Sequence, residues 1–411
     1  MNQQMHTDKN QDRESASRED EHLTRLVGKV LHIEQTIWGR SDDPYIARYQ
    51  GELLKPSSKA YDQISQALYS SQITPIFRKE KGKHIIFLKR GLFRGQKRKT
   101  WVNVLLFMAT FLSMLFAGVF NSYAGPITSD LTVLWTHIKP ELGGAFAFTF
   151  SLLGILTAHE FGHYFMARYH KTKVTLPYFI PFPLSPFGTM GAFISLQEPP
   201  KNKRSLLDIG IAGPLAGLVV AIPVLIYGLS LSPVEPLPQP LPSGEFFFEG
   251  NSILYLGLKY IVHGQWLPDP ASFRGLHPVI YWIRYFFTGL PLPRGGVDVS
   301  IHPVAWAGWA GLLVTALNLL PAGQLDGGHL IYGLLGDRAK KLWPFILAFL
   351  VVMGFVWSGW WLWAFLILIF GRAQAEPLDQ ITELDPKRKV LARVGLIIFI
   401  LVFTPVPLVT V

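Results

Sequence analysis

Apolar residues gather in long runs after about position 100, whereas the residues before that point alternate between polar and apolar types. The runs carry few charges, and most are long enough to cross a bilayer as helices, which takes about 20 apolar residues. In chain order they lie near 101 to 120, 144 to 170, 206 to 229, 303 to 320, 342 to 370 and 391 to 409, with two weaker stretches near 251 to 263 and 277 to 290. The pattern predicts an α-helical polytopic membrane protein with about 6–8 transmembrane helices.

The residues before the first run predict a small soluble part. Residues 1 to 25 are polar and are expected to form a disordered tail. In residues 26 to 97, YIARYQGELL alternates like a strand and SSKAYDQISQALYSS has helical spacing. The stretch ITPIFRKEKGKHIIFL predicts a hairpin that turns at Lys81-Gly82-Lys83. We therefore expect an α+β module over 26–97 and a transmembrane domain over 98–411, the module being a cytoplasmic cap in preference to a partner-binding domain.

Composition changes this picture in two ways. Cys is absent, which excludes disulfides and any thiolate metal site. The formal net charge is +10, but much of it lies in short clusters beside the apolar runs, such as KRGLFRGQKRK before the first run. These clusters indicate cytoplasmic loops and contact with the anionic lipid of the bilayer, and they argue against nucleic-acid binding.

Three ionisable residues interrupt the apolar run from 144 to 170. His159, Glu160 and His163 form an H-E-x-x-H motif, and two His at i and i+4 share one face of a helix, where both can bind one zinc ion. The adjacent Glu can act as general base on the metal-bound water. Ionisable groups within a bilayer are costly, so a functional reason is favoured over a chance string at the wet end of a helix.

The stretch NLLPAGQLDG, from Asn318 to Gly327, lies where the run from 303 to 320 ends. Two His leave zinc short of a protein ligand, and Asp326 is the obvious third. Pro321 ends a helix and the glycines allow a sharp turn that directs Asp326 inward. The alternative is an exposed turn acid, but basic clusters place both motifs toward the same, cytoplasmic side.

The two motifs together resemble the site-2 protease family of intramembrane zinc metalloproteases. The stretches PYFIPFP, FGTMGAFI, DIGIAGPLAG and SIHPVAWAGW look most like the branch that contains the chloroplast ethylene-dependent gravitropism-deficient and yellow-green proteases and their bacterial relatives. The resemblance implies an enzyme that hydrolyses peptide bonds within or near transmembrane segments of membrane-anchored protein substrates, with one Zn²⁺ per chain.

The resemblance also implies roles for individual residues. His159, His163 and Asp326 would bind the zinc ion, Glu160 would be the catalytic base, and Asn318 would assist substrate or oxyanion binding. The segment from Gly188 to Ile194 would be a re-entrant β-like edge strand, with Gly188 and Gly191 contacting substrate. No PDZ-like insertion is evident.

Two other functions compete with a protease. A metal or ion transporter would be expected to show internal repeats and polar residues in several spans, whereas the polar cluster here is confined to two motifs. A catalytically inactive membrane scaffold would be marked by loss of Glu160 or of a ligand, and all four residues are intact.

Other features carry weaker indications. His302 and His329 are expected to be helix-cap or interfacial residues in preference to partners of the metal ligands. The chain opens without an apolar leader, which favours a multi-pass protein of a bacterial plasma membrane over a plastid protein. The N-terminus and active site are expected on the cytoplasmic side, and the sequence gives no indication of an oligomeric state.

Overall fold

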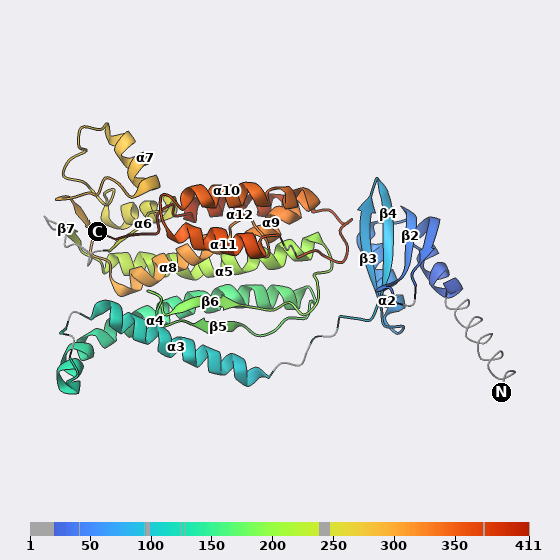
Figure 1. Cartoon of the computed structure of the whole chain (residues 1–411), viewed down its shortest axis with the longest axis horizontal. Helices are drawn as coiled ribbons and strands as arrows, with labels where there is room; N and C mark the ends of the chain where they lie inside the picture. The colour runs from blue at the N-terminus through green and yellow to red at the C-terminus, as the bar shows by residue number, and fades with distance from the viewer. Residues whose placement is uncertain are drawn as a thin grey trace. The chain divides into compact units, whose positions relative to one another are not determined.

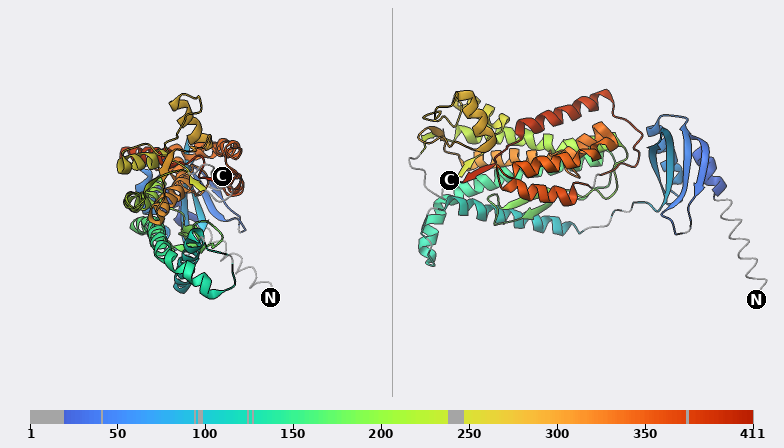
Figure 2. Two further views of the ribbon diagram at one scale, coloured as in Figure 1. Left: turned by 90° about the vertical axis from the view of Figure 1, so that its left-hand side faces the viewer. Right: turned by 45° about the horizontal axis from the view of Figure 1, so that its top comes forward.

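The computed structural model describes residues 20–40, 42–93, 95, 99–123, 125–126, 128–237, 247–372 and 375–410. The chain forms two compact units, shown in Figures 1 and 2. The first comprises residues up to 96 together with 197–206 and 376–385, and the second comprises the remainder. The N-terminal unit is therefore discontinuous in sequence. Two segments from the C-terminal three quarters of the chain belong to it.

The N-terminal unit is built on a four-stranded antiparallel sheet. Its strand order is β1-β2-β4-β3, and α2 lies in the chain between β2 and β3. The elements are β1 (Leu31–Trp38), β2 (Tyr45–Leu53), α2 (Ser57–Leu68), β3 (Ile73–Glu80) and β4 (Lys83–Arg90), preceded by a helix over residues 20–28. Lys81 and Gly82 join β3 to β4 with φ of 47° and 84°, the positive values that a two-residue hairpin turn requires.

The N-terminal end of this unit differs from the prediction made from the sequence. The strand over 31–38 and the helix over 20–28 were not predicted, and the helix occupies part of the region assigned to a disordered tail. The tail up to residue 19 lies outside the described residues. Leu23 and Val27 of the helix are buried in the core of this unit, which explains why these residues are ordered.

Segment 376–385 adds to the free edge of β3. The Phe77 amide donates to the Leu378 carbonyl at 2.9 Å, and the Gln380 amide donates to the Phe77 carbonyl at 3.1 Å. Asp379 lies at the centre of this contact, fully buried. Its carboxylate accepts from Ser57 Oγ at 2.8 Å and from the Ile381 amide at 2.9 Å. The segment therefore covers a strand edge that would otherwise expose unpaired backbone groups.

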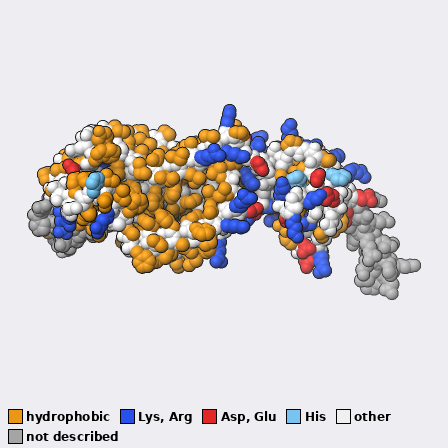
Figure 3. Space-filling model, turned by 90° about the horizontal axis from the view of Figure 1, so that it is seen from above, with side chains coloured by type: hydrophobic (Ala, Val, Ile, Leu, Met, Phe, Trp, Pro, Cys, Tyr) orange, Lys and Arg blue, Asp and Glu red, His pale blue; other side chains and the backbone are white. Residues whose placement is uncertain are grey.

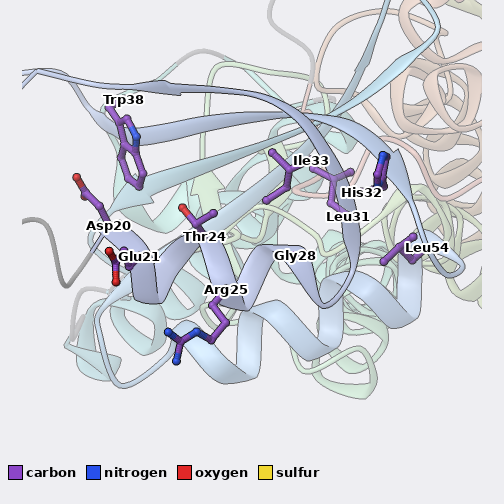
Figure 4. A pocket seen from close by; sticks show the side chains of 10 residues that line it. All are labelled: Asp20, Glu21, Thr24, Arg25, Gly28, Leu31, His32, Ile33, Trp38 and Leu54. Carbon is purple, nitrogen blue, oxygen red and sulfur yellow. The ribbon is translucent and has the colours of Figure 1, made fainter.

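A hollow of about 690 Å³ lies between the helix over 20–28 and β1 in the N-terminal unit. Figure 4 shows its side chains from within. The charged ones, Asp20, Glu21 and Arg25, are spread along the helix and do not converge on one point. The hollow therefore lacks the convergent polar groups of a catalytic site.

The second unit is mostly helical. Its helices are α3 (Thr100–Ser122), α4 (Leu131–Tyr169), α5 (Lys203–Ser230, which begins in the N-terminal unit), α6 (Ile253–His263), α7 (Pro278–Thr288), α8 (Pro303–Asn318), α9 (Asp326–Leu335), α10 (Trp343–Met353), α11 (Gly359–Phe370) and α12 (Pro386–Val402), with a 3-10 turn over Gly336–Lys341. Three short antiparallel pairs complete it: β5 (Tyr178–Pro181) with β6 (Thr189–Phe193), β7 (Val234–Pro236) with β9 (Val297–Val299), and β8 (Phe247–Glu249) with β10 (Leu408–Thr410).

Three of the described helices, α3, α4 and α5, are long and apolar enough to cross a membrane. The shorter apolar helices are α6, α10 and α11. Large hydrophobic side chains cover the outer face of the helical unit, and basic residues gather at the ends of that face (Figure 3). Such a surface would be a liability in water and is expected in lipid. The second unit is therefore a membrane-embedded helical bundle.

Candidate metal centre

The H-E-x-x-H residues lie together on the inner face of α4. His159, Glu160 and His163 expose 3%, 4% and 6% of their surface, although each carries a polar group. Asp326 is the first residue of α9 and projects toward them. The site is therefore built from two separate elements. The two His lie four residues apart on one face of α4, and the carboxylate comes from α9, whose first residue follows His163 by 163 residues.

The three candidate ligand atoms form a nearly equilateral triangle. His159 Nε2 lies 3.2 Å from His163 Nε2, and Asp326 Oδ2 lies 3.3 Å from the first and 3.2 Å from the second. Tetrahedral ligands that each lie roughly 2.0–2.2 Å from zinc are separated from one another by about 3.3–3.6 Å. Two imidazoles and one carboxylate are also a donor set that zinc accepts. The residues therefore fit a zinc ion in both chemistry and spacing.

The side chain of His163 is oriented by backbone. Its Nδ1 lies 2.7 Å from the carbonyl of Ile209 in α5. Because a carbonyl can only accept, Nδ1 must carry the proton, which leaves Nε2 as the free lone pair facing Asp326. Partners of this kind fix the tautomer and the ring plane of a metal ligand.

Helix α5 approaches the two imidazoles through glycine. A Cβ built on Gly213 would lie 2.0 Å from His163 Nε2, and one built on Gly217 would lie 3.2 Å from His159 Nδ1. Gly162 on α4 approaches in return, since a Cβ there would meet the Ala212 carbonyl at 2.5 Å. The small residues of GPLAG thus leave the space that the imidazole rings occupy.

The turn between α8 and α9 is also built on glycine. Gly323 has a φ of +57°, and a Cβ on Gly327 would lie 1.9 Å from the Leu319 carbonyl. The chain therefore folds tightly back after Asn318, where α8 ends, and Pro321 follows within the turn. This fold brings Asp326 and Asn318 to the same place. Asn318 Nδ2 lies 3.4 Å from His159 Nε2.

A small pocket of about 190 Å³ opens onto the cluster. Glu160 lines it beside the three candidate ligands, and so do Asn318 and residues 192–194 at the end of β6. Within the described chain β6 pairs only with β5, so its other edge carries backbone groups without a strand partner. The pocket therefore brings together the buried carboxylate of Glu160, a candidate metal centre and a strand edge.

The two glycines expected to contact substrate lie elsewhere on the hairpin. Gly188 packs against α3: Ser113 Oγ donates to its carbonyl at 2.6 Å, and a Cβ on Gly188 would lie 2.4 Å from Met114 Cα. Gly191 has a φ of +99° and open space around it. Neither is among the residues that line the pocket, whereas Ala192, Phe193 and Ile194 are.

Two contributors to the site had not been singled out for it from the sequence: Gln324, which lines the pocket, and the Ile209 carbonyl, which orients His163. His329, expected to be a helix-cap or interfacial residue in preference to a partner of the metal ligands, also lines the pocket. His302, by contrast, caps α8, where its Nδ1 accepts from the Val304 amide at 3.2 Å. A backbone carbonyl leaves no signal in a sequence, but His329 follows Asp326 by three residues and so shares its helix face.

The chain is similar in sequence to a peptidase family and to several named proteins. The model of peptidase family M50 matches residues 147–357, which include both motifs. A protein named probable zinc metalloprotease EGY1, chloroplastic, from Arabidopsis thaliana is 33% identical over 277 residues, which are 66% of this chain and 44% of the relative. The rice protein of the same name (Oryza sativa subsp. japonica) is 28% identical over 75% of this chain and 50% of the relative.

A third relative, probable zinc metallopeptidase EGY3, chloroplastic, from Arabidopsis thaliana, is 27% identical over 65% of this chain and 43% of its own length. The chain thus spans half or less of the length of these relatives. No solved structure gives a significant match.

Proposed function

The chain belongs to peptidase family M50, and on this premise we propose that it is a zinc-dependent endopeptidase that cleaves membrane-anchored proteins within or near their transmembrane segments. The observation that carries the proposal is the triangle of His159 Nε2, His163 Nε2 and Asp326 Oδ2, with sides of 3.2–3.3 Å, beside the buried carboxylate of Glu160. The relatives named as zinc metalloproteases support the same assignment.

In this proposal His159, His163 and Asp326 hold one zinc ion. When bound, zinc supplies Lewis-acid polarisation of the scissile carbonyl and of a water molecule. Glu160 accepts a proton from the attacking water and then donates it to the nitrogen of the leaving amine. Its burial next to the ligands keeps the carboxylate at the site where both transfers take place.

Asn318 has a positioning and binding role in the proposal. Its amide lies against His159 and lines the pocket, so it can donate a hydrogen bond to the oxygen on which negative charge develops. Preorganised donors of this kind contribute strongly to acyl-transfer catalysis because they need no rearrangement during the reaction.

The substrate must be unwound before it can be cleaved. A transmembrane helix hides its peptide groups in hydrogen bonds between residues i and i−4. The open edge of β6 offers replacement backbone partners, and residues 192–194 place that edge at the pocket. We propose that the substrate adds to this edge as an extended segment. In this proposal Gly188 and Gly191 allow the backbone conformation of the hairpin. Any contact that they make with substrate lies outside the pocket, whose lining includes residues 192–194.

The proposed membrane arrangement includes helices beyond the three long apolar ones. We propose about 6–8 passes, in which α8, α10, α11 and α12 complete the bundle around α3, α4 and α5. We propose that the N-terminal unit and the active site lie on the cytoplasmic side, which the basic clusters support by the positive-inside rule. The expectation of a bacterial plasma membrane has no support from the relatives, whose names say chloroplastic.

Zinc content and cleavage of a model transmembrane substrate test the function together. Wild type and Glu160→Gln should each bind one zinc per chain, whereas Asp326→Ala should lose it, and only wild type should cleave. An inactive scaffold would bind zinc without cleaving any of a panel of substrates. Cleavage by Glu160→Gln at the wild-type rate would refute the role of Glu160, and absence of zinc from purified wild type would refute the metal centre.

A further inference from the structure

A second pocket lies in the helical unit, away from the metal centre. It has a volume of about 270 Å³ and is lined by residues of α6, of α7 and of the segments next to them. Figure 1 shows where these two helices lie. A water molecule takes about 30 Å³ in the liquid, so the pocket has room for an organic group. Its lining residues are Asn251, Leu256, Trp266, Trp282, Tyr285 and Phe286.

The lining has the geometry of an aromatic cage. The rings of Trp282 and Tyr285 stand at 84° to one another with centroids 6.0 Å apart, so they form two perpendicular walls. Trp266 adds a third aromatic group and is itself stacked on Tyr260 at 4.6 Å. Perpendicular aromatic faces of this kind attract cations, because each ring carries negative charge on its face.

Asn251 is the polar group of the pocket. It is 93% buried, and its amide oxygen has no hydrogen-bond partner among the described residues. A buried carbonyl oxygen without a donor is costly, and such an atom is the exception in folded proteins. The Asn251 oxygen therefore lacks a hydrogen-bond donor among the described residues, and a ligand can supply one.

A buried acidic group adjoins the pocket. Glu249 and Asp298 lie 3.5 Å and 3.6 Å from the ammonium of Lys259, and all three are buried. Burial raises the pKa of Glu249, which favours its uncharged form, so the cluster can hold one negative charge against the one positive charge of Lys259. Burial also raises the pKa of the Tyr285 phenol well above its ordinary value, and the carboxylates of Asp298 and Glu249 add to that rise.

The exposed side chains of α7 indicate which class of molecule supplies the cation. Val279, Ile280, Ile283 and Phe287 form one stripe along α7, and each exposes more than half of its surface. The opposite face of the helix buries Tyr281 and Tyr285. A short helix with an exposed apolar stripe and flanking Trp side chains is typical of a helix that lies at the membrane interface, where lipid headgroups are found.

We propose that this pocket binds the primary ammonium headgroup of a membrane lipid. The ammonium donates a hydrogen bond to Asn251 Oδ1 and lies against the faces of Trp282 and Tyr285, while the acyl chains follow the apolar stripe of α7. A quaternary ammonium would retain the attraction to the rings but has no N–H for Asn251. The pocket should therefore discriminate phosphatidylethanolamine from phosphatidylcholine.

Native mass spectrometry of the full chain in detergent, titrated with each of these two lipids, tests the proposal. Wild type should bind phosphatidylethanolamine about tenfold more tightly than phosphatidylcholine, as expected for one charge-assisted hydrogen bond. Asn251→Leu should abolish this preference without weakening phosphatidylcholine binding, and Trp282→Leu should weaken both. Asn251→Asp should strengthen phosphatidylethanolamine binding, which keeps the test valid if the Leu variant folds poorly.

The variants are first checked for wild-type zinc content, which reports an intact bundle independently of lipid. Equal affinity of wild type for the two lipids, or a preference that survives in Asn251→Leu, would overturn the proposal. Displacement of phosphatidylethanolamine from wild type by a soluble lysine-containing peptide would also overturn the proposal, because the ligand of the pocket would then be a polypeptide.

Discussion

Gly213 sets how closely α5 can approach the candidate metal ligands. The distance of 2.0 Å between a Cβ built there and His163 Nε2 is far below any van der Waals contact. Either the imidazole or the helix must move if a methyl group is added. Displacement of one ligand by about 1 Å is enough to disturb both metal binding and catalysis.

Gly213→Ala should therefore lower zinc affinity by about tenfold or more and lower cleavage in parallel. Zinc retained after dialysis against a chelator is the measurement. Gly154→Ala is the matched control, because Gly154 lies on the same helix as the H-E-x-x-H motif and has open space at its Cβ position. Similar zinc retention in both variants would contradict the role given to Gly213.

At the scale of single residues, the sequence predicts chemistry well and geometry poorly. The spacing of His159, Glu160 and His163 implies one helix face, and the structure brings Asp326 to it. The hydrogen bond from His163 to the Ile209 carbonyl could not be predicted, since any residue has a carbonyl. The positions of Gly188 and Gly191 relative to the pocket depend on how the hairpin packs on α3, which periodicity does not encode.

At the scale of elements, one cluster of polar and charged side chains connects α4, α5 and α12 near the C-terminus of α4. Asp208 of α5 lies 2.9 Å from His170 Nε2, next to the C-terminus of α4, and 2.6 Å from the guanidinium of Arg388 on α12. Asp208 is buried, so its two partners replace water that it lost on folding. The cluster fixes the relative positions of the helices that carry and surround the H-E-x-x-H motif.

Removing the shared carboxylate should destabilise the bundle. Asp208→Ala leaves the Arg388 guanidinium without its anion and His170 Nε2 without its partner, and should cost about 2 kcal/mol, after allowance for the partial exposure of Arg388. We expect a Tm lower by about 3 °C or more in detergent. Asp337→Ala removes an exposed ion pair with Lys340 and should change the Tm little. Equal Tm values for the two variants would refute the structural role of the cluster.

The helix pattern shows where element prediction fails. The apolar run began near 144, whereas α4 begins at Leu131 and continues through Pro140. Asp130 caps it, accepting from the Thr132 amide at 2.8 Å. The first turns of this helix mix apolar residues with His137, Lys139 and Glu141, so they do not form a continuous apolar run. At 39 residues and about 1.5 Å each, the helix is longer than the bilayer core.

At the scale of the whole molecule, the discontinuous N-terminal unit was the least predictable feature. Local patterns in residues 45–90 indicate the strand, the helix and the hairpin that the structure contains. Nothing in segments 197–206 and 376–385 signals that they join this sheet, because their partners lie about 100 to 300 residues away in the sequence. Contacts of such separation carry no periodic signature.

Asp379 should be the residue on which this unit depends most. Asp379→Ala removes the acceptor for Ser57 Oγ and for the Ile381 amide in a fully buried place, at a cost of about 3 kcal/mol or more. Amide hydrogen exchange in β3 and in segment 376–385 should accelerate, while zinc content stays at the wild-type level. Asp62→Ala, which removes an exposed partner of Lys201, is the control. Unchanged exchange in Asp379→Ala would contradict this assignment.

The insertion of segment 376–385 beside β3 has a consequence for how the chain is made. A ribosome finishes the N-terminal strands when most of the helices are still to be synthesised, yet the edge of β3 is covered only once residue 380 has emerged. Until then Phe77 keeps unpaired backbone groups that can pair with another nascent chain. The N-terminal sheet is thus among the last parts of the described chain to reach its native state, and a chain that stops short of residue 380 should be an aggregation-prone product.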